Sequence, residues 1–369
     1  MFARRHLLVA SAALLAGSGF SFRNAIADWA PIDPAEAGFA ADLPARIDQF
    51  AAGKNIHGVI VVWRGRVVTE RYYAGDDQVR IGGRSKIERV AFTAERSHEL
   101  RSVTKSIIGL LYGIALGQGK VPALDQPLLA QFPQYTDLPD MAQRRRWTIA
   151  HAITMTLGTE WNEEISYEDP RNGQTAMEAA PDRYRYVLEQ PIVAVAGERW
   201  IYSGGATVLI GKIIEKGIGG SVHDYARRVL FNPLGIGPTE WRVGRDGELN
   251  FASGLAMRPR DLARVGQMLL DGGKVGERQI VPADWLEASF KPAVRINDRR
   301  QYGYHWYLAN VTSEARRRTR WVAARGNGGQ RLFVFPELEL VLVVTAGGYN
   351  QRDLGSDDLF GEVVLPSIK

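Results

Sequence analysis

The sequence predicts an α/β fold in which both ends of the chain build one mainly antiparallel sheet, with helices on both faces. Strand-like apolar runs occur at residues 58–73 and again between 302 and 345, and helical runs lie between them. The simplest arrangement is one sheet with a helical insertion. We therefore expect one unit over residues 28–369. Its sheet part is predicted at about 40–100 and 295–369, and its helical part at about 101–294.

The composition is that of a globular protein and excludes several chemistries. The chain has 369 residues, of which 45% are hydrophobic and 24% charged, and it has no cysteine. Disulfides, a thiol nucleophile and cysteine-ligated metals are therefore excluded. The net charge is only +5, and no basic run is interleaved with aromatics, so we expect no nucleic-acid partner. The six histidines are scattered and His98-Glu99 lacks a second histidine nearby, so no metal site is expected.

The first 27 residues have the pattern of a signal peptide. Arg4-Arg5 precede an apolar run from Leu7 to Ala16, and Ala25-Ile26-Ala27 forms a cleavage pattern. The paired arginines are typical of the twin-arginine export route. An N-terminal membrane anchor is the alternative, although the run is shorter than the roughly 20 residues of a spanning helix. We expect a periplasmic or secreted protein with no stable membrane span after the signal is removed.

Before residue 100 the chain alternates between one helix and several β-rich segments. Residues 42–53 place their apolar side chains on one helical face. Residues 58–63 and 67–73 predict two strands, and 64–66 contain a glycine suited to a hairpin turn. Residues 75–97 are polar, and we expect them to be irregular.

A strongly apolar helix is predicted at 102–116. Its glycines recur every fourth residue, so we expect a second backbone to pack closely against it. Further helices are predicted at 206–216 and 261–270, and residues 161–190 are expected to form a long, partly exposed excursion. The predicted C-terminal strands are Tyr302–Leu308, Trp321–Ala324, Leu332–Phe335 and Leu340–Thr345.

The first candidate catalytic motif is Ser102-Val103-Thr104-Lys105, at the start of the apolar helix. Free N–H groups at a helix start favour negative charge, and residues three apart share a face. A lysine in an apolar first turn can be desolvated, which lowers its pKa and lets it activate a hydroxyl. The alternative is an N-capping serine followed by a surface lysine.

Two further motifs are candidates for catalytic roles, one before a predicted helix and one between two predicted strands. Tyr202 stands just before the helix at 206–216, where its phenol could face a cleft. Beside a lysine ammonium a phenolate is favoured and can act as a base, whereas the alternative is a buried aromatic side chain. Residues 325–330 (RGNGGQ) lie between two predicted strands. Their glycines would let backbone N–H groups approach a substrate as oxyanion donors, although a tight hairpin turn has the same pattern.

These motifs, in this order, resemble those of serine hydrolases of the β-lactamase-like, penicillin-binding family. That family includes class C β-lactamases, D-alanyl-D-alanine peptidases, carboxylesterases and 6-aminohexanoate-dimer hydrolases. The resemblance implies a β-lactamase/transpeptidase-like fold. It implies that Ser102 is the nucleophile, that Lys105 activates it and that Tyr202 is the partner base. It implies no metal and no cofactor.

Two departures from the family pattern concern the substrate. Gly204 stands where the family's Y-x-N motif has asparagine. The K-T-G motif of many members is matched by Ala324-Arg325-Gly326 or, in the other register, by Gly326-Asn327-Gly328, and neither contains the lysine. The second oxyanion amide is that of Asn327 in the first register and of Gly329 in the second, and we prefer Asn327 beside that of Ser102. The expected substrate-binding residues are Arg325, Gly326, Gly328 and Tyr167, with Asp169 as an alternative to Tyr167.

We therefore expect a hydrolase of small-molecule esters or linear amides that works through an acyl-enzyme on Ser102. One alternative is a β-lactamase or a penicillin-binding D-alanyl-D-alanine peptidase. A second alternative is a non-catalytic binding protein that keeps the fold.

Overall fold

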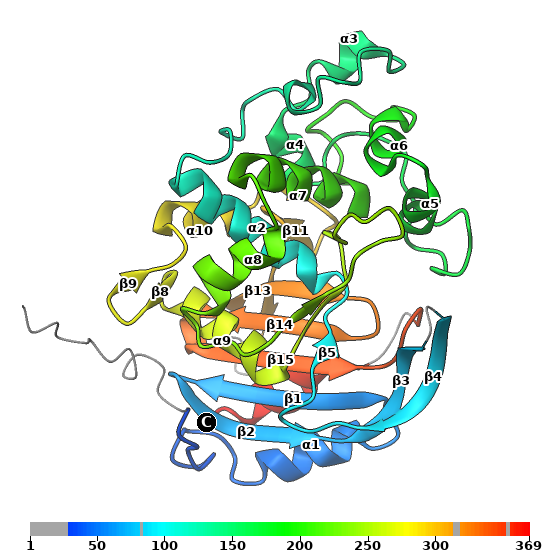
Figure 1. The fold of residues 1–369 in the computed structure, drawn as a ribbon. Helices are drawn as coiled ribbons and strands as arrows, with labels where there is room; N and C mark the ends of the chain where they lie inside the picture. The colour runs from blue at the N-terminus through cyan, green and yellow to red at the C-terminus, as the bar shows by residue number, and fades with distance from the viewer. Residues whose placement is uncertain (1–28, 82–83, 313–317, 352–354) are drawn as a thin grey trace, which may run out of the picture.

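A computed structural model describes residues 29–81, 84–312, 318–351 and 355–369. The predicted signal peptide, residues 1–27, lies outside the described residues. The described chain forms a large antiparallel sheet with helices on both of its faces and a further group of helices beyond them (Figure 1).

Both ends of the chain contribute to the main sheet, as predicted. Its eight strands follow the order β10-β11-β12-β13-β14-β15-β1-β2, and each pair is antiparallel. The N-terminal hairpin joins the C-terminal strands where Ile60 pairs with Val343. The bounds are β1 Ile56–Trp63, β2 Arg66–Tyr72, β10 Val294–Arg295, β11 Arg300–Tyr302, β12 Tyr307–Thr312, β13 Arg318–Gly326, β14 Gln330–Phe335 and β15 Leu340–Ala346.

The central strands are apolar on both sides because both faces of the sheet are covered. In β1, Ile60 and Val62 belong to the hydrophobic cluster under the helical region, whereas Val59 and Val61 belong to the cluster on the opposite face. This alternation follows from the two-residue period of a strand. The sheet therefore separates two cores.

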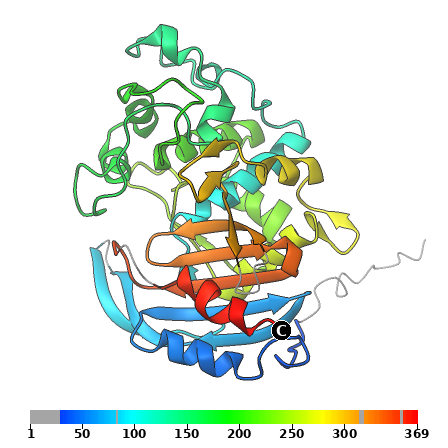
Figure 2. The ribbon, with the colours of Figure 1, turned by 180° about the vertical axis from the view of Figure 1, so that it is seen from behind.

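Helices cover each face. On one face lie α1, Leu43–Ala51, and the C-terminal turns Phe360–Val364 and Leu365–Ser367 (Figure 2). On the other face lie α2, Val103–Gly117, and α9, Pro259–Leu270, which contacts β1, β14 and β15. The remaining helices are α3 Met141–Arg144, α4 Ile149–Ile153, α5 Gly173–Ala179, α6 Arg183–Glu189, α7 Gly204–Ile218, α8 Val222–Ala226 and α10 Ala283–Ser289. Short helical turns occupy Leu129–Gln131, Arg227–Phe231 and Pro336–Leu338.

Small sheets complete the fold. They comprise the ribbon β3 Ala74–Ile81 with β4 Arg84–Ala91, the group β5 His98–Glu99, β7 Leu255–Met257 and β6 Glu240–Trp241, and the pair β8 Lys274–Val275 with β9 Arg278–Gln279. The ribbon corrects the expectation that residues 75–97 are irregular. Among the described residues, β3 and β4 pair with each other and with no other strand. A two-stranded ribbon needs no long apolar face, so the sequence lacks the alternation of apolar and polar residues that predicts a strand.

Two other expectations were wrong in detail. The single strand predicted at Tyr302–Leu308 is two strands, β11 and β12, which pair with each other. The glycine stripe of α2 does not simply face a second backbone. A side chain at Gly113 would collide with the Trp285 ring of α10, while Gly109 does face the backbone carbonyl of Tyr304. Other predicted helices and strands lie at or near their observed bounds.

Candidate active site

Ser102 lies at the N-terminal end of α2, where the chain leaves β5 and enters the helix. Leu100 is tied to β7 through its amide, which donates to the carbonyl of Leu255 at 2.8 Å. Arg101 has a φ of 51°, an uncommon value for a non-glycine residue. Ser102 itself is 8% exposed and lines two cavities of about 210 and 250 Å³. The helix start therefore presents a nearly buried hydroxyl to a cleft.

Lys105 lies one turn further along α2, against Ser102. Its Nζ is 2.9 Å from Ser102 Oγ and 2.9 Å from the backbone carbonyl of Ala252. The side chain is buried, and this burial lowers the pKa of Lys105, while the carboxylate of Glu163 acts in the opposite direction. The alternative of a surface lysine is thus wrong. A neutral amine here can accept a proton from the serine hydroxyl.

Tyr202, just before α7, joins this pair across the cleft. The Lys105 Nζ lies 5.0 Å from the centre of its ring, and Tyr202 lines the larger of the two cavities together with Ser102. Burial raises the pKa of Tyr202, and Glu163 raises it further, although Ser102 and Arg325 oppose this shift. Burial and the Glu163 carboxylate therefore act against a phenolate at Tyr202, and its role as a base stays a prediction. A protonated phenol at this position can donate a proton rather than take the first one.

The glycine-rich turn between β13 and β14 approaches the start of α2. A side chain at Gly326 would lie 2.4 Å from the carbonyl oxygen of Leu100, so only glycine permits this approach. Asn327 follows and lines both cavities with Ser102. The Gly329 amide donates to the Gly326 carbonyl at 3.3 Å, within the turn. Gly328 packs against the Tyr349 ring, where its added side chain would collide. The turn thus brings Gly326 and Asn327 to the cleft.

Glu163 is a buried residue that the sequence motifs did not indicate. Its Oε1 accepts hydrogen bonds from the Gly204 amide at 2.5 Å and from Trp161 Nε1 at 2.6 Å, and its Oε2 accepts one from the Tyr167 hydroxyl at 3.0 Å. Tyr167 lines both cavities, as expected. Asp169 instead forms an ion pair with Arg171. Only the richness of residues 161–190 in acidic and aromatic residues could have pointed to Glu163.

A comparison of the sequence with known protein families identifies the family of the chain. The β-lactamase family model matches residues 43–360. The chain belongs to the β-lactamase family. This β-lactamase-family protein therefore has the fold of serine hydrolases that act on small molecules.

Two curated relatives match part of the chain. A 6-aminohexanoate-dimer hydrolase of Paenarthrobacter ureafaciens is 26% identical over 243 residues, 62% of this chain and 55% of that protein. A β-lactamase of Escherichia coli (strain K12) is 24% identical over 212 residues, 56% of this chain and 51% of that protein. The chain thus spans about half the length of these relatives.

Solved structures share the fold over nearly the whole chain. A Bacillus anthracis protein provisionally named a 6-aminohexanoate-dimer hydrolase has a TM-score of 0.72 at 17% identity, covering 93% of this chain and 87% of that one. EstCE1, a hydrolase with promiscuous acyltransferase activity, has a TM-score of 0.65 at 15% identity, covering 89% and 98%. At these low sequence identities, the similarity to solved structures shows a shared fold.

Gly204 stands where the Y-x-N motif has asparagine, and other side chains of the chain occupy the space beside it. A side chain added at Gly204 would lie 2.7 Å from Glu163 Oε1 and 3.1 Å from Gln174 Oε1. Gln174 also lines the smaller cavity and donates to Ser253 Oγ at 3.2 Å. The space of the missing side chain is therefore occupied by a carboxylate and an amide from the excursion.

In the preferred register, Ala324-Arg325-Gly326, Arg325 is the residue expected to take the place of the K-T-G lysine. Arg325 lines the larger cavity, and its guanidinium pairs with Asp357 at 2.5 Å. Arg331 pairs with the same carboxylate at 2.6 Å. Although burial acts to raise it, the two arginines hold the pKa of Asp357 at about 2. The two arginines therefore give this wall of the cleft a positive charge, which the single carboxylate of Asp357 partly balances.

In the part of the chain that the structure describes, no helix has both the length and the apolar character needed to cross a membrane.

Proposed function

We propose that this protein is a serine hydrolase that cleaves an ester or a linear amide through an acyl-enzyme on Ser102. The observation that carries the proposal is the 2.9 Å contact between Lys105 Nζ and Ser102 Oγ at a buried helix start. A serine hydroxyl beside a lysine with a lowered pKa is an activated nucleophile.

The proposed proton path begins on the lysine. Neutral Lys105 takes the Ser102 proton while Oγ forms a bond to the substrate carbonyl carbon. The carbonyl of Ala252 accepts from Nζ and orients the amine. When the tetrahedral intermediate collapses, the phenol of Tyr202 gives its proton to the leaving oxygen or nitrogen and is reprotonated from the Lys105 ammonium. A water molecule then releases the acyl group by the reverse path.

The oxyanion is proposed to accept hydrogen bonds from the backbone amides of Ser102 and Asn327. Free N–H groups at the start of α2 suit the first role. The Asn327 register is supported over Gly329 because the Gly329 amide already donates to Gly326.

The proposed substrates are small esters or linear amides. The name of the Paenarthrobacter ureafaciens relative is that of a linear-amide hydrolase, and EstCE1 is named as a hydrolase with acyltransferase activity. The absence of the K-T-G lysine and the pairing of Arg325 with Asp357 weigh against a carboxylate-bearing β-lactam. From the N-terminal pattern we further propose that the protein is exported from the cytoplasm.

The test combines covalent labelling with a substrate panel. A fluorophosphonate probe should label the purified protein at Ser102, as located by peptide mass spectrometry. A p-nitrophenyl acetate, a 6-aminohexanoate dimer and a chromogenic cephalosporin are then compared by kcat/KM. Absence of labelling and turnover would support the non-catalytic alternative. A cephalosporin preference would support the β-lactamase alternative.

A further inference from the structure

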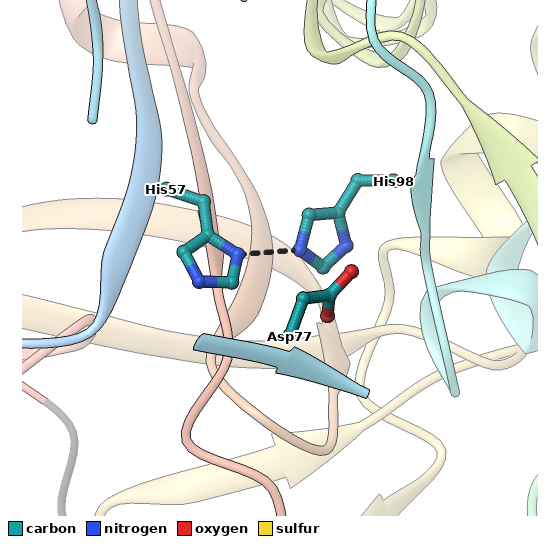
Figure 3. Close-up of side chains that lie close together, drawn as sticks. All are labelled: His57, Asp77 and His98. Atoms are coloured by element: carbon teal, nitrogen blue, oxygen red, sulfur yellow. Dashed lines mark hydrogen bonds between the residues drawn. The ribbon is translucent and has the colours of Figure 1, made fainter. Parts of the chain in front are cut away.

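Three side chains from distant parts of the sequence converge beside the strand that leads to Ser102. His57 comes from β1, Asp77 from β3 and His98 from β5 (Figure 3). His57 Nδ1 lies 2.9 Å from His98 Nε2, and one ligand atom of each residue lies within 4.8 Å of the others. Both histidines are buried, at 0% and 1% exposure.

The two nitrogens that face each other, His57 Nδ1 and His98 Nε2, are here called the inner nitrogens. The other nitrogen of each ring, the outer nitrogen, faces a hydrogen-bond acceptor. His98 Nδ1 is 3.0 Å from the backbone carbonyl of Glu99, so this nitrogen carries a proton. His57 Nε2 is 3.2 Å from Asn55 Oδ1. The orientation of Asn55 is set by Asp76, whose carbonyl accepts from Nδ2 at 2.7 Å and whose amide donates to Oδ1 at 2.9 Å. The outer nitrogen of His57 is therefore also the protonated one.

The inner nitrogens are consequently left with lone pairs that point at each other. A neutral imidazole has one N–H and one lone pair, and both N–H groups are already committed outward. Two lone pairs 2.9 Å apart repel unless a cation lies between them or beside them. The Asp77 carboxylate lies below the His98 ring (Figure 3), and one of its oxygens is within 4.8 Å of a nitrogen of each histidine. The hydroxyl of Tyr349 donates to Asp77 Oδ1 at 2.5 Å, which leaves the other oxygen for a cation.

The arrangement has the features of a transition-metal site. Imidazole nitrogen and carboxylate oxygen suit first-row divalent ions, and ligating histidines donate their second N–H to a carbonyl. With metal–nitrogen bonds of about 2.0–2.1 Å, two nitrogens 2.9 Å apart subtend about 90° at the ion, a value met in octahedral or tetragonal sites. Phe92 stacks on His57 with ring centres 4.0 Å apart and shields one face.

We propose that His57, Asp77 and His98 bind a first-row divalent transition-metal ion, which ties β1, β3 and β5 together. The role is structural, and it is independent of the hydrolysis proposed above. His98 precedes the nucleophile Ser102 by four residues. Gln78, next to Asp77, accepts a hydrogen bond from Arg101 at 2.7 Å and lines the cleft. The ion would therefore brace one wall of the active site.

The full chain is first treated with a chelator, dialysed and titrated with ZnCl₂. Bound metal is counted by plasma mass spectrometry after gel filtration, and Tm is followed against zinc concentration. We expect one ion per chain and a Tm that rises with the logarithm of zinc concentration. Co²⁺ should compete with zinc and give a visible d–d absorption band. Failure to retain zinc or cobalt would overturn the proposal and leave a histidine pair that shares a proton.

Variants locate the ion. Asp77→Asn keeps an acceptor for Tyr349 but removes the charge, so zinc affinity should fall by at least about ten-fold. His98→Gln should abolish retention. The matched controls are Asp76→Asn, at the exposed neighbouring position, and His223→Gln, a histidine that instead contacts Thr239. If His98→Gln does not fold, the comparison of Asp77→Asn with Asp76→Asn still decides. Equal affinity in all variants would place the ion elsewhere and overturn the proposal.

Discussion

The carboxylate of Glu163 accepts a hydrogen bond from the backbone amide of Gly204, and it lies where a side chain on Gly204 would stand. Among the charges that raise the pKa of Lys105 against the effect of burial, Glu163 has the largest effect, and it also raises the pKa of Tyr202. A residue from the excursion at 161–190 thus lies behind both groups that the proposed mechanism uses for proton transfer.

The first prediction concerns the nucleophile. Ser102→Ala should remove all fluorophosphonate labelling and lower kcat/KM by about 10⁴-fold or more, as nucleophile deletions do. The matched control is Ser106→Ala, one helical turn along α2, whose hydroxyl donates to the His305 carbonyl at 2.6 Å. This control should lose some stability and keep its activity. Activity retained in Ser102→Ala but lost in Ser106→Ala would show that the motif has been misassigned.

The second prediction concerns pH. Because burial lowers the pKa of Lys105 below 10.5 and the base is the neutral amine, kcat/KM should rise with pH through that lowered value. Between it and 10.5 the unfolded chain binds one more proton than the folded chain at this residue. The free energy of unfolding should therefore rise with pH across that window. Lys105→Met should lose both effects. They are measured by rate profiles and by urea unfolding at several pH values.

The third prediction separates the phenol of Tyr202 from its ring. Tyr202→Phe keeps the packing but removes the proton donor, so kcat should fall about 10²- to 10⁴-fold with little change in Tm. Tyr112→Phe serves as the contrast, because its hydroxyl donates to the Pro122 carbonyl at 2.7 Å, away from Ser102. That variant should lose stability and keep kcat. A reversed pattern would favour a purely structural Tyr202.

The fourth prediction tests Glu163 as a positioning residue. Glu163→Gln keeps acceptors for Gly204 and Trp161 but removes the charge that raises the Lys105 pKa. The ascending limb of the kcat/KM profile should therefore shift to lower pH, and Tm should change little. Glu160→Gln, at an exposed position just before the same segment, should leave the profile unchanged. An unshifted profile in Glu163→Gln would reduce this residue to a packing role.

The fifth prediction concerns the substrate. A charge-assisted hydrogen bond to a carboxylate is worth roughly 1.5–3 kcal/mol, or about 10- to 150-fold. Because Arg325 already pairs with Asp357, its charge is partly used, and a cephalosporin should have a lower kcat/KM than a p-nitrophenyl ester. Both are measured on one preparation. A cephalosporin value well above the ester value, lost in Arg325→Ala, would contradict this prediction.

Much of the fold follows from local sequence patterns. The apolar period of α2 and the spacing of Ser102 and Lys105 place these two residues on one helical face, because residues three apart are neighbours on a helix. The β1–β2 hairpin is predicted by two alternating apolar runs and a glycine turn, and the structure confirms it. These predictions depend only on residues that are close in the chain.

The tertiary structure decided what depends on distant segments. The pairing of β1 with β15 brings the two ends of the chain into one sheet, and the residues of the polar ribbon β3–β4 pair along their whole length. In the sequence, Gly204 shows only that a side chain is missing at this position. The packing of the excursion shows that the Glu163 carboxylate occupies the space of that side chain. Likewise, His57 and His98 are separated by 41 residues and lie in different sheets, and only the folded chain brings His57 Nδ1 and His98 Nε2 to 2.9 Å from each other. Local spacing therefore determined the helix that carries Ser102 and Lys105, whereas the packing of distant segments determined its electrostatic surroundings.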